Sequence, residues 1–243
     1  KGVLQRLENQ GATILTSSQH NAQSQQASPP ANPPTVGNHN QPTTTNRYAT
    51  SPAGKNGVYQ EVEPACEAAH RAYQQLCEKG IAGRRAVVDI VKRLCVQNAN
   101  EWGKYEYEET GIGRLEHKPE KLNLINDVPG VEWLQSRCMS GDHGLTVEEF
   151  TPFGVIGSIL PMTHSIPTLA GNVVNMVAAG NAVVFNPHPG GAKSAALATA
   201  AFNREIEREL GIKDLICCIE KPTLETFDHL TQSDKIKILC ITG

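Results

Sequence analysis

The sequence predicts an α/β fold in which a parallel sheet is covered by helices on both faces, behind a disordered leader. Two observations lead to this prediction. From Gly154 onward, four short apolar runs alternate with segments of helical periodicity. Continuous apolar strands that alternate with helices are typical of a sheet buried on both faces. Between Thr16 and Gly57, by contrast, the only charged residues are Arg47 and Lys55, and most of the others are small or polar.

The leader is expected to have two parts. Val3, Leu4 and Leu7 share one side of a short helix, so residues 1–15 are read as an amphipathic docking helix or, alternatively, as a frayed terminus. Residues 16–57 lack the apolar area that would offset the entropy cost of ordering. We therefore expect a disordered linker over residues 16–57 and a folded domain over residues 58–243.

Two helices and a hairpin are expected ahead of the sheet. Pro64 fits the start of one helix and Gly80 its end. The next helix carries an i, i+3, i+4, i+7 stripe made by Val87, Ile90, Val91 and Leu94. The segment 130–154 reads as two strands around the turn "SGDHG".

The sheet is expected to use four strands, "GVIGSIL", "NAVVFNP", "DLICCIE" and "KIKILCIT". Helices are expected between them near residues 165–179, 191–210 and 224–230. Right-handed crossovers would make these strands parallel, and ligands of such sheets sit beyond the carboxyl ends of the strands.

The strand ends read "ILPMTH", "VFNPHPGGAKS", "CIEKPT" and "CITG", and each brings turn-forming or polar residues to the same edge. Four such ends together predict a crevice for a nucleotide cofactor. The candidate cofactor-binding residues are Leu160, Pro161, Met162, Thr163, Asn186, His188, Gly190, Gly191, Pro222, Thr223, Thr242 and Gly243.

The turn after the second strand is the predicted anion site. Gly190 and Gly191 let the backbone come close, and the free N–H groups of the next helix favour a cofactor phosphate. Asn186 and His188 each precede a proline, which forces extended geometry; they either face the crevice or belong to a stiff surface turn. Neither "PGGAKSA" nor "TGIGRL" fits a P-loop or a dinucleotide fingerprint, because the required glycines are missing.

Composition excludes several function classes. The chain has 22 Lys and Arg against 25 Asp and Glu, with no basic run, so no nucleic-acid partner is expected. Nothing approaches the roughly 20 apolar residues of a membrane span. The seven cysteines match no zinc or disulfide spacing, so no metal is expected. Cys217, Cys218 and Cys240 lie in apolar strands and are expected to be core rather than nucleophiles.

The block "TPFGVIGSILPMTHSIPTLAGNVVNMVAAGNAVVFNPHP" resembles the cofactor-binding half of the aldehyde dehydrogenase superfamily. That family carries a Pro-Trp-Asn turn, a helix ending in Ala-Ala-Gly-Asn and a strand ending in Lys-Pro. Thr163 falls where the asparagine of the turn falls, and "EETGIGRLEHKPEKL" and "CITG" resemble the family's Glu-Thr-Gly and Phe-Thr-Gly segments. The resemblance covers about Val58 to Gly243 and implies a Rossmann-like nucleotide-binding domain.

The departures "PMTH", "FNPHPGGAKS" and "GDHGLTVEEFTPFGV" look like the coenzyme A-acylating aldehyde dehydrogenases of bacterial microcompartments. This likeness implies that a Cys thiolate attacks a short aldehyde, NAD takes the hydride and coenzyme A releases acyl-CoA. The family's nucleophile lies beyond the turn at Gly243, so this chain alone is expected to be inactive. Thr163 is the candidate oxyanion contact. Asn186 and Pro189 replace the residues that hold the ribose and help to select NAD, so NADP stays open.

The resemblance also implies partners and a location. A short amphipathic helix before a flexible linker targets enzymes of this branch to a microcompartment shell, so a shell protein is a candidate partner of residues 1–15. The complete protein is expected to be a homo-oligomer in the cytoplasm, inside a microcompartment. Two alternatives stay open: an aldehyde dehydrogenase that yields a free acid, and a catalytically dead scaffold or cargo adaptor.

Overall fold

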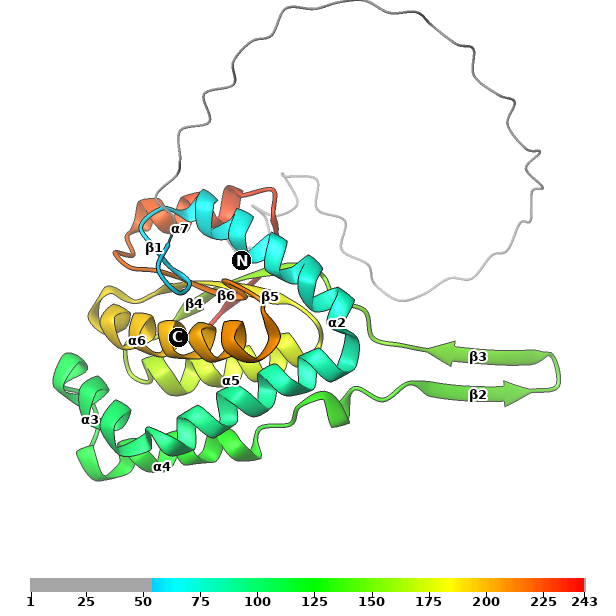
Figure 1. Ribbon diagram of the computed structural model, residues 1–243, viewed down its shortest axis with the longest axis horizontal. Coiled ribbons are helices and arrows are strands. Elements are labelled where there is room, and N and C mark those ends of the chain that lie inside the picture. Colours follow the sequence, from blue (N-terminus) through cyan, green and yellow to red (C-terminus); the bar gives the residue numbers. More distant parts are fainter. Residues whose placement is uncertain (1–53, 243) are drawn as a thin grey trace, which may run out of the picture. The chain divides into compact units, whose positions relative to one another are not determined.

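The computed structural model describes residues 54–242, which form a five-stranded sheet with helices around it (Figure 1). The strand order is β1-β6-β5-β4-β7, and every neighbouring pair is parallel. The predicted α/β class is confirmed. The strands are β1 Val58–Tyr59, β4 Val155–Leu160, β5 Ala182–Pro187, β6 Ile216–Ile219 and β7 Ile236–Ile241.

The register brings the strand ends to one edge. Leu160 at the end of β4 pairs with Pro187 at the end of β5, and Ile159 pairs with Ile241 at the end of β7. Phe185 of β5 pairs with Cys218 of β6. The four turns that were predicted to share an edge therefore do so.

The main helices are α2 Val62–Gln97, α3 Ala99–Thr110, α4 Lys118–Asn123, α5 Ser165–Ala178, α6 Ala192–Leu210 and α7 Leu224–Gln232. In Figure 1, α7 and the first half of α2 lie above the strands, whereas α5 and α6 lie below them. Helices thus cover both faces, as predicted. Gly80 has φ 61° and ψ −155°, so α2 breaks at the glycine that was expected to end a helix.

Strands β2 Arg137–Gly141 and β3 Gly144–Glu148 form an antiparallel hairpin, which confirms the turn predicted at "SGDHG". All ten strand residues are exposed. Figure 1 shows the hairpin extending away from the helices and the sheet. Two of its large apolar side chains, Leu145 and Val147, are 64% and 56% exposed. The hairpin therefore contributes nothing to the core of the described domain.

The core is built where β4, β5 and β6 meet the surrounding helices. The side chains of these three strands are almost wholly buried, as expected for continuous apolar strands. Cys217 and Cys218 are fully buried, so the prediction that they are core residues is confirmed. Cys240 is only half-buried because β7 is an edge strand, on which Ile241 is 62% exposed.

The predicted helix over residues 1–15, most of the predicted linker and Gly243 lie outside the described residues. Residues 54–57, assigned to the linker from composition, belong to the described fold. The carbonyl of Gly57 accepts the N–H of Cys218 at 2.8 Å, and the amide of Asn203 donates to the carbonyl of Asn56 at 3.1 Å. Within residues 54–242, no helix is both long and apolar enough to cross a membrane.

Candidate nucleotide-binding site

A cavity of about 300 Å³ opens at the carboxyl edge of the sheet, beyond the ends of β4, β5 and β6. Its lining is mostly apolar and includes Ile159, Pro187, Pro189, Leu224 and Phe227. An apolar cavity with a few polar groups at this edge is the usual form of a small-molecule site in such sheets. Five of the predicted residues line it: Leu160, Asn186, His188, Pro222 and Thr223.

Asn186 forms part of the cavity wall and is 5% exposed. The prediction that its side chain faces the crevice is supported over the alternative of a surface turn. Its Oδ1 accepts a hydrogen bond from Oγ1 of Thr226 at 2.8 Å. Thr226 and Thr223 also form a capping box at the start of α7, in which each side chain accepts the backbone N–H of the other. Hydrogen bonds within the protein therefore fix the side chains on this side of the cavity.

The turns after β4 and β5 are joined to each other. The N–H of His188 donates to the carbonyl of Leu160 at 3.0 Å, and Oγ of the buried Ser165 donates to the carbonyl of Gly191 at 2.7 Å. A Cβ added at Gly190 would lie 2.4 Å from Sδ of Met162. A larger residue at position 190 would therefore displace the Met162 side chain.

The predicted phosphate site at the start of α6 is occupied by a side chain of the protein. Oε1 of Glu109 accepts the N–H of Lys193 at 2.9 Å, and Oε2 accepts the N–H of Ser194 at 2.7 Å. The same Oε2 also accepts the hydroxyl of Ser194. The prediction that these N–H groups bind a cofactor phosphate is wrong for this reason, since a carboxylate already satisfies them.

His188 is exposed, and its Nδ1 accepts the N–H of Gly190 at 3.0 Å. Of the two predicted alternatives, the stiff surface turn fits the exposed position of His188. The side chain nevertheless remains on the cavity wall.

The turn after β4 carries Pro161, Met162 and Thr163. The Thr163 side chain is exposed, and its hydroxyl makes no hydrogen bond to any of residues 54–242. Its carbonyl accepts a hydrogen bond from Nζ of Lys118 at 3.2 Å. The N–H of Thr242 donates to the carbonyl of Ile159 at 3.2 Å, which brings the "CITG" turn beside this one.

The imidazole of His164, which follows Thr163, lies against the ammonium group of Lys121. Nζ of Lys121 lies 3.0 Å from Nε2 and 3.3 Å from Nδ1 of His164. Burial, followed by the charge of Lys121, holds the pKa of His164 below its ordinary value. The imidazole is therefore held in its neutral form over a wider pH range than usual.

A second cavity of about 250 Å³ lies beyond the ends of β1 and β6, where Tyr59, Glu61, Pro64 and Glu220 line it. The hydroxyl of Tyr59 donates to Oδ2 of Asp214 at 2.9 Å.

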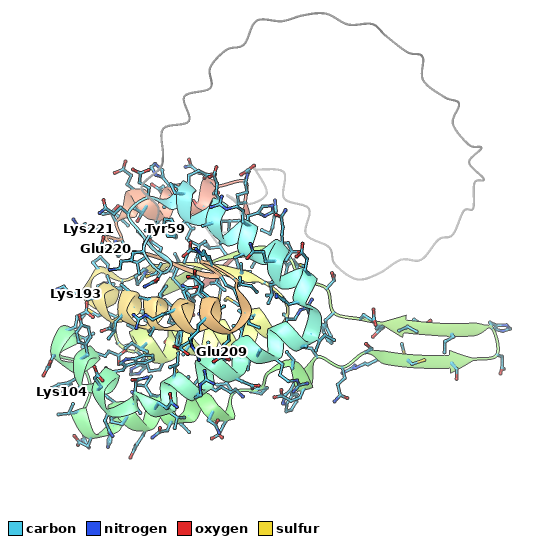
Figure 2. The ribbon with its side chains drawn as sticks, in the orientation of Figure 1. Tyr59, Lys104, Lys193, Glu209, Glu220 and Lys221 are labelled. Atoms are coloured by element: carbon cyan, nitrogen blue, oxygen red, sulfur yellow. The ribbon has the colours of Figure 1, made fainter. Side chains whose placement is uncertain are left out.

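Figure 2 shows Glu220 and Lys221, which follow β6, on the same side as Lys193 at the start of α6. Glu209, near the other end of α6, lies away from them.

The cysteines do not supply a nucleophile to this site. None of the seven lines the 300 Å³ cavity. Burial raises the pKa of the Cys66 thiol to about 11 and that of the Cys95 and Cys218 thiols to about 12. Cys217 is shifted in the same direction, also chiefly by burial. Thiols with raised pKa values stay protonated at neutral pH and are poor nucleophiles.

Several site residues were missed by the sequence reasoning. Glu106, Glu109 and Lys118 contact the turns, although none of the three was among the predicted site residues. Glu109 lies in the "EETG" segment that supported the family resemblance. The motif therefore marked this residue, but it did not show that the side chain binds the start of α6. Thr226 lies three residues after Thr223, a spacing that marks a helix start.

Parallel strands, helices on both faces and a cavity at the carboxyl edge together define a doubly wound α/β domain of the nucleotide-binding type. The model of the aldehyde dehydrogenase family matches residues 31–243. The chain therefore belongs to the aldehyde dehydrogenase family, as the sequence motifs predicted.

Known members resemble the chain over much of its length. It is 34% identical over 203 residues to the propanal dehydrogenase (CoA-propanoylating) of Salmonella typhimurium, covering 83% of this chain and 43% of that protein. The structure of Rhodopseudomonas palustris propionaldehyde dehydrogenase with bound propionyl-CoA superposes with a TM-score of 0.75. Sequence identity to it is 35%, over 79% of this chain and 43% of that one.

A propionaldehyde dehydrogenase from the Clostridium phytofermentans fucose utilisation bacterial microcompartment superposes with a TM-score of 0.74. It shares 33% identity over 77% of this chain and 43% of that one. The chain thus spans about two-fifths of the length of these relatives.

Proposed function

We propose that the protein containing this chain oxidises a short aldehyde to acyl-CoA with NAD and coenzyme A. Residues 58–243 would supply its nucleotide-binding part. The observation that carries the proposal is the single cavity beyond β4, β5 and β6, which collects residues from three separate turns. The choice of an acylating reaction is supported by the names of the relatives, which include a CoA-propanoylating enzyme and one with bound propionyl-CoA.

The chemistry of the cavity suits the adenosine end of a dinucleotide. Pro222, Leu224 and Phe227 offer apolar surface for an adenine ring, and Leu224 is 84% exposed. Asn186 offers an amide where the wider family has a lysine, so the ribose would be held by a neutral group. Phosphates would lie away from the start of α6, because Glu109 would repel them.

Thr163 is proposed to contact the oxyanion that forms during attack on the aldehyde. Its exposed hydroxyl is a free donor at the edge of the sheet. When bound, the nicotinamide supplies the hydride acceptor. The nucleophile would be the cysteine of the family's catalytic segment, because burial raises the pKa of four of this chain's thiols: Cys66, Cys95, Cys217 and Cys218.

The test is an assay of the complete protein with acetaldehyde or propanal, coenzyme A and NAD. We expect formation of NADH together with a thioester, both dependent on coenzyme A. A free acid formed without coenzyme A would support the non-acylating alternative instead. No turnover of any short aldehyde would support the scaffold or adaptor. Parallel reactions with NADP decide which nucleotide is preferred.

Self-association is also proposed. The exposed β2–β3 hairpin carries apolar side chains, including Met139, Leu145 and Val147, that no other part of the described domain covers. Large exposed apolar groups on a projecting hairpin are typical of an interface. A second copy of the chain is the proposed partner, and charged substitutions at Leu145 and Val147 should reduce the oligomer seen by sedimentation.

The proposed location is the cytoplasm, inside a microcompartment whose shell protein binds residues 1–15. This proposal rests on the amphipathic pattern of Val3, Leu4 and Leu7 and on the microcompartment origin of one relative. Deletion of residues 1–53, which leaves the described fold intact, should abolish encapsulation. Unchanged encapsulation after the deletion would refute it.

A further inference from the structure

Helix α3 carries two glutamates, one turn apart, that bond the first turns of two different helices. Oε1 of Glu106 accepts the N–H of Ile166 at 2.8 Å, in the first turn of α5. Glu109 accepts the N–H groups of Lys193 and Ser194, in the first turn of α6. Helices α5 and α6 directly follow the two turns that border the candidate site.

Lys118 completes the arrangement. Its side chain is 1% exposed, and Nζ donates to Oε2 of Glu106 at 2.8 Å and to the carbonyl of Thr163 at 3.2 Å. Both oxygens of Glu106 are thus used, one by the lysine and one by the backbone of α5. A buried ion pair tolerates little movement, because a displaced partner leaves an uncompensated charge.

Packing fixes α3 itself. The ring of Trp102 on α3 meets the ring of Phe202 on α6 edge to face, with centroids 5.6 Å apart. Figure 2 shows Lys193, at the start of α6, on the same side of the molecule as Lys104 of α3. The carboxylates of α3 are therefore presented from a rigid helix rather than from a loop.

We propose that Glu106, Lys118 and Glu109 are positioning residues for the site. Glu106 and Lys118 set the turn that carries Thr163, and Glu109 sets the turn that carries His188. The inference rests on the proposed function, because Thr163 is assigned to the oxyanion and His188 to the nucleotide cavity. It predicts a division of labour, in which Glu106 and Lys118 affect kcat and Glu109 affects the KM for the nucleotide.

The first experiment needs no activity. Amide hydrogen exchange is measured on this chain for the double variant Glu106→Gln/Lys118→Met, for Glu109→Gln and for the control Glu108→Gln. The double variant avoids leaving one charge buried alone. Glu108 lies on the same helix, with its side chain 61% exposed and paired with Lys104.

We expect exchange about 10-fold faster at Ile166 in the double variant and at Ser194 in Glu109→Gln, because each N–H loses a charged acceptor. Amides of the central strand β5 should be unchanged in all variants. Equal exchange in these variants and in Glu108→Gln would overturn the inference. So would faster exchange throughout β5, which would show general destabilisation instead of local positioning.

The second experiment measures acyl-CoA formation by the complete protein. The double variant should lower kcat about 10- to 100-fold with the nucleotide KM within threefold of wild type, as expected for a displaced group near the chemistry. Glu109→Gln should raise the nucleotide KM about 10-fold. If kcat and the nucleotide KM of both variants lie within threefold of those of Glu108→Gln, the positioning role is refuted. An inactive wild type would instead refute the proposed function, and the inference would then be decided by the exchange experiment.

Discussion

Replacement of Asn181 by alanine should destabilise the domain strongly, although Asn181 lies in a family motif and does not line the 300 Å³ cavity. Its side chain is 2% exposed. Oδ1 accepts the N–H of Phe153 at 2.7 Å and the N–H of Gly154 at 3.1 Å, and Nδ2 donates to the carbonyl of Met176 at 3.0 Å. The side chain thus links the residues just before β4 with the end of α5 by hydrogen bonds.

The magnitude follows from the bonds that are lost. Asn181→Ala leaves two backbone N–H groups without their acceptor, at a cost of roughly 1–3 kcal/mol for each one that stays buried. Gly154 is buried and the Phe153 bond is partly buried, so a total loss of about 3 kcal/mol is expected. For a domain of this size, that loss lowers the melting temperature by about 6–12 °C.

The assay is urea unfolding followed by far-UV circular dichroism, with Asn175→Ala as the matched control. Asn175 is exposed and lies on α5, so its replacement should change the free energy of unfolding by less than about 0.5 kcal/mol. A loss below 1 kcal/mol for Asn181→Ala would refute the structural reading of the motif. The asparagine would then need a different explanation.

Three further outcomes are expected. Gly180→Ala should cost about 2 kcal/mol in the same unfolding assay, because φ is 91° and the new Cβ would lie 2.5 Å from Cζ of Arg84; an unchanged midpoint would contradict this. In an NMR titration the imidazole of His164 should have a pKa below 6.5, and this pKa should rise in Lys121→Met. Because His164 binds fewer protons in the folded state than in the unfolded chain, it adds stability above pH 6.5, and this stability is lost as the pH falls through the pKa of the folded state. A midpoint at or above 6.5 would count against burial of that ring. A thiol reagent at pH 8 should rapidly label the two exposed cysteines, Cys77 and Cys138. Four buried cysteines should stay unlabelled until urea is added: Cys66, Cys95, Cys217 and Cys218. Rapid labelling of any of these four would show that the core opens.

Much of the fold was predictable from local patterns. The apolar runs around Val155, Ala182, Ile216 and Ile236 are long enough to identify strands, and the helices between them have clear apolar stripes. The two-residue strand at Val58 was missed because two residues carry no periodicity. Its pairing with β6 is a tertiary contact that no local pattern reveals.

The site was predictable only in part. The position of a turn relative to the sheet follows from topology, so the grouping of Leu160, Asn186 and Thr223 could be predicted. The occupant of the α6 N-terminus could not, because Glu109 is 85 residues away from Ser194 along the chain. A helix N-terminus attracts any anion, and sequence spacing does not distinguish a phosphate from an internal carboxylate.

The central claim is that the ends of β4, β5 and β6 form one nucleotide site. The most direct measurement is a titration of this chain with NAD, followed by backbone amide chemical shifts. The largest shifts should occur at Leu160, Asn186 and Thr223, with little change at Val155, Ala182 and Ile236 on the opposite edge of the sheet. Shifts concentrated on that opposite edge, or none at millimolar NAD, would contradict the claim.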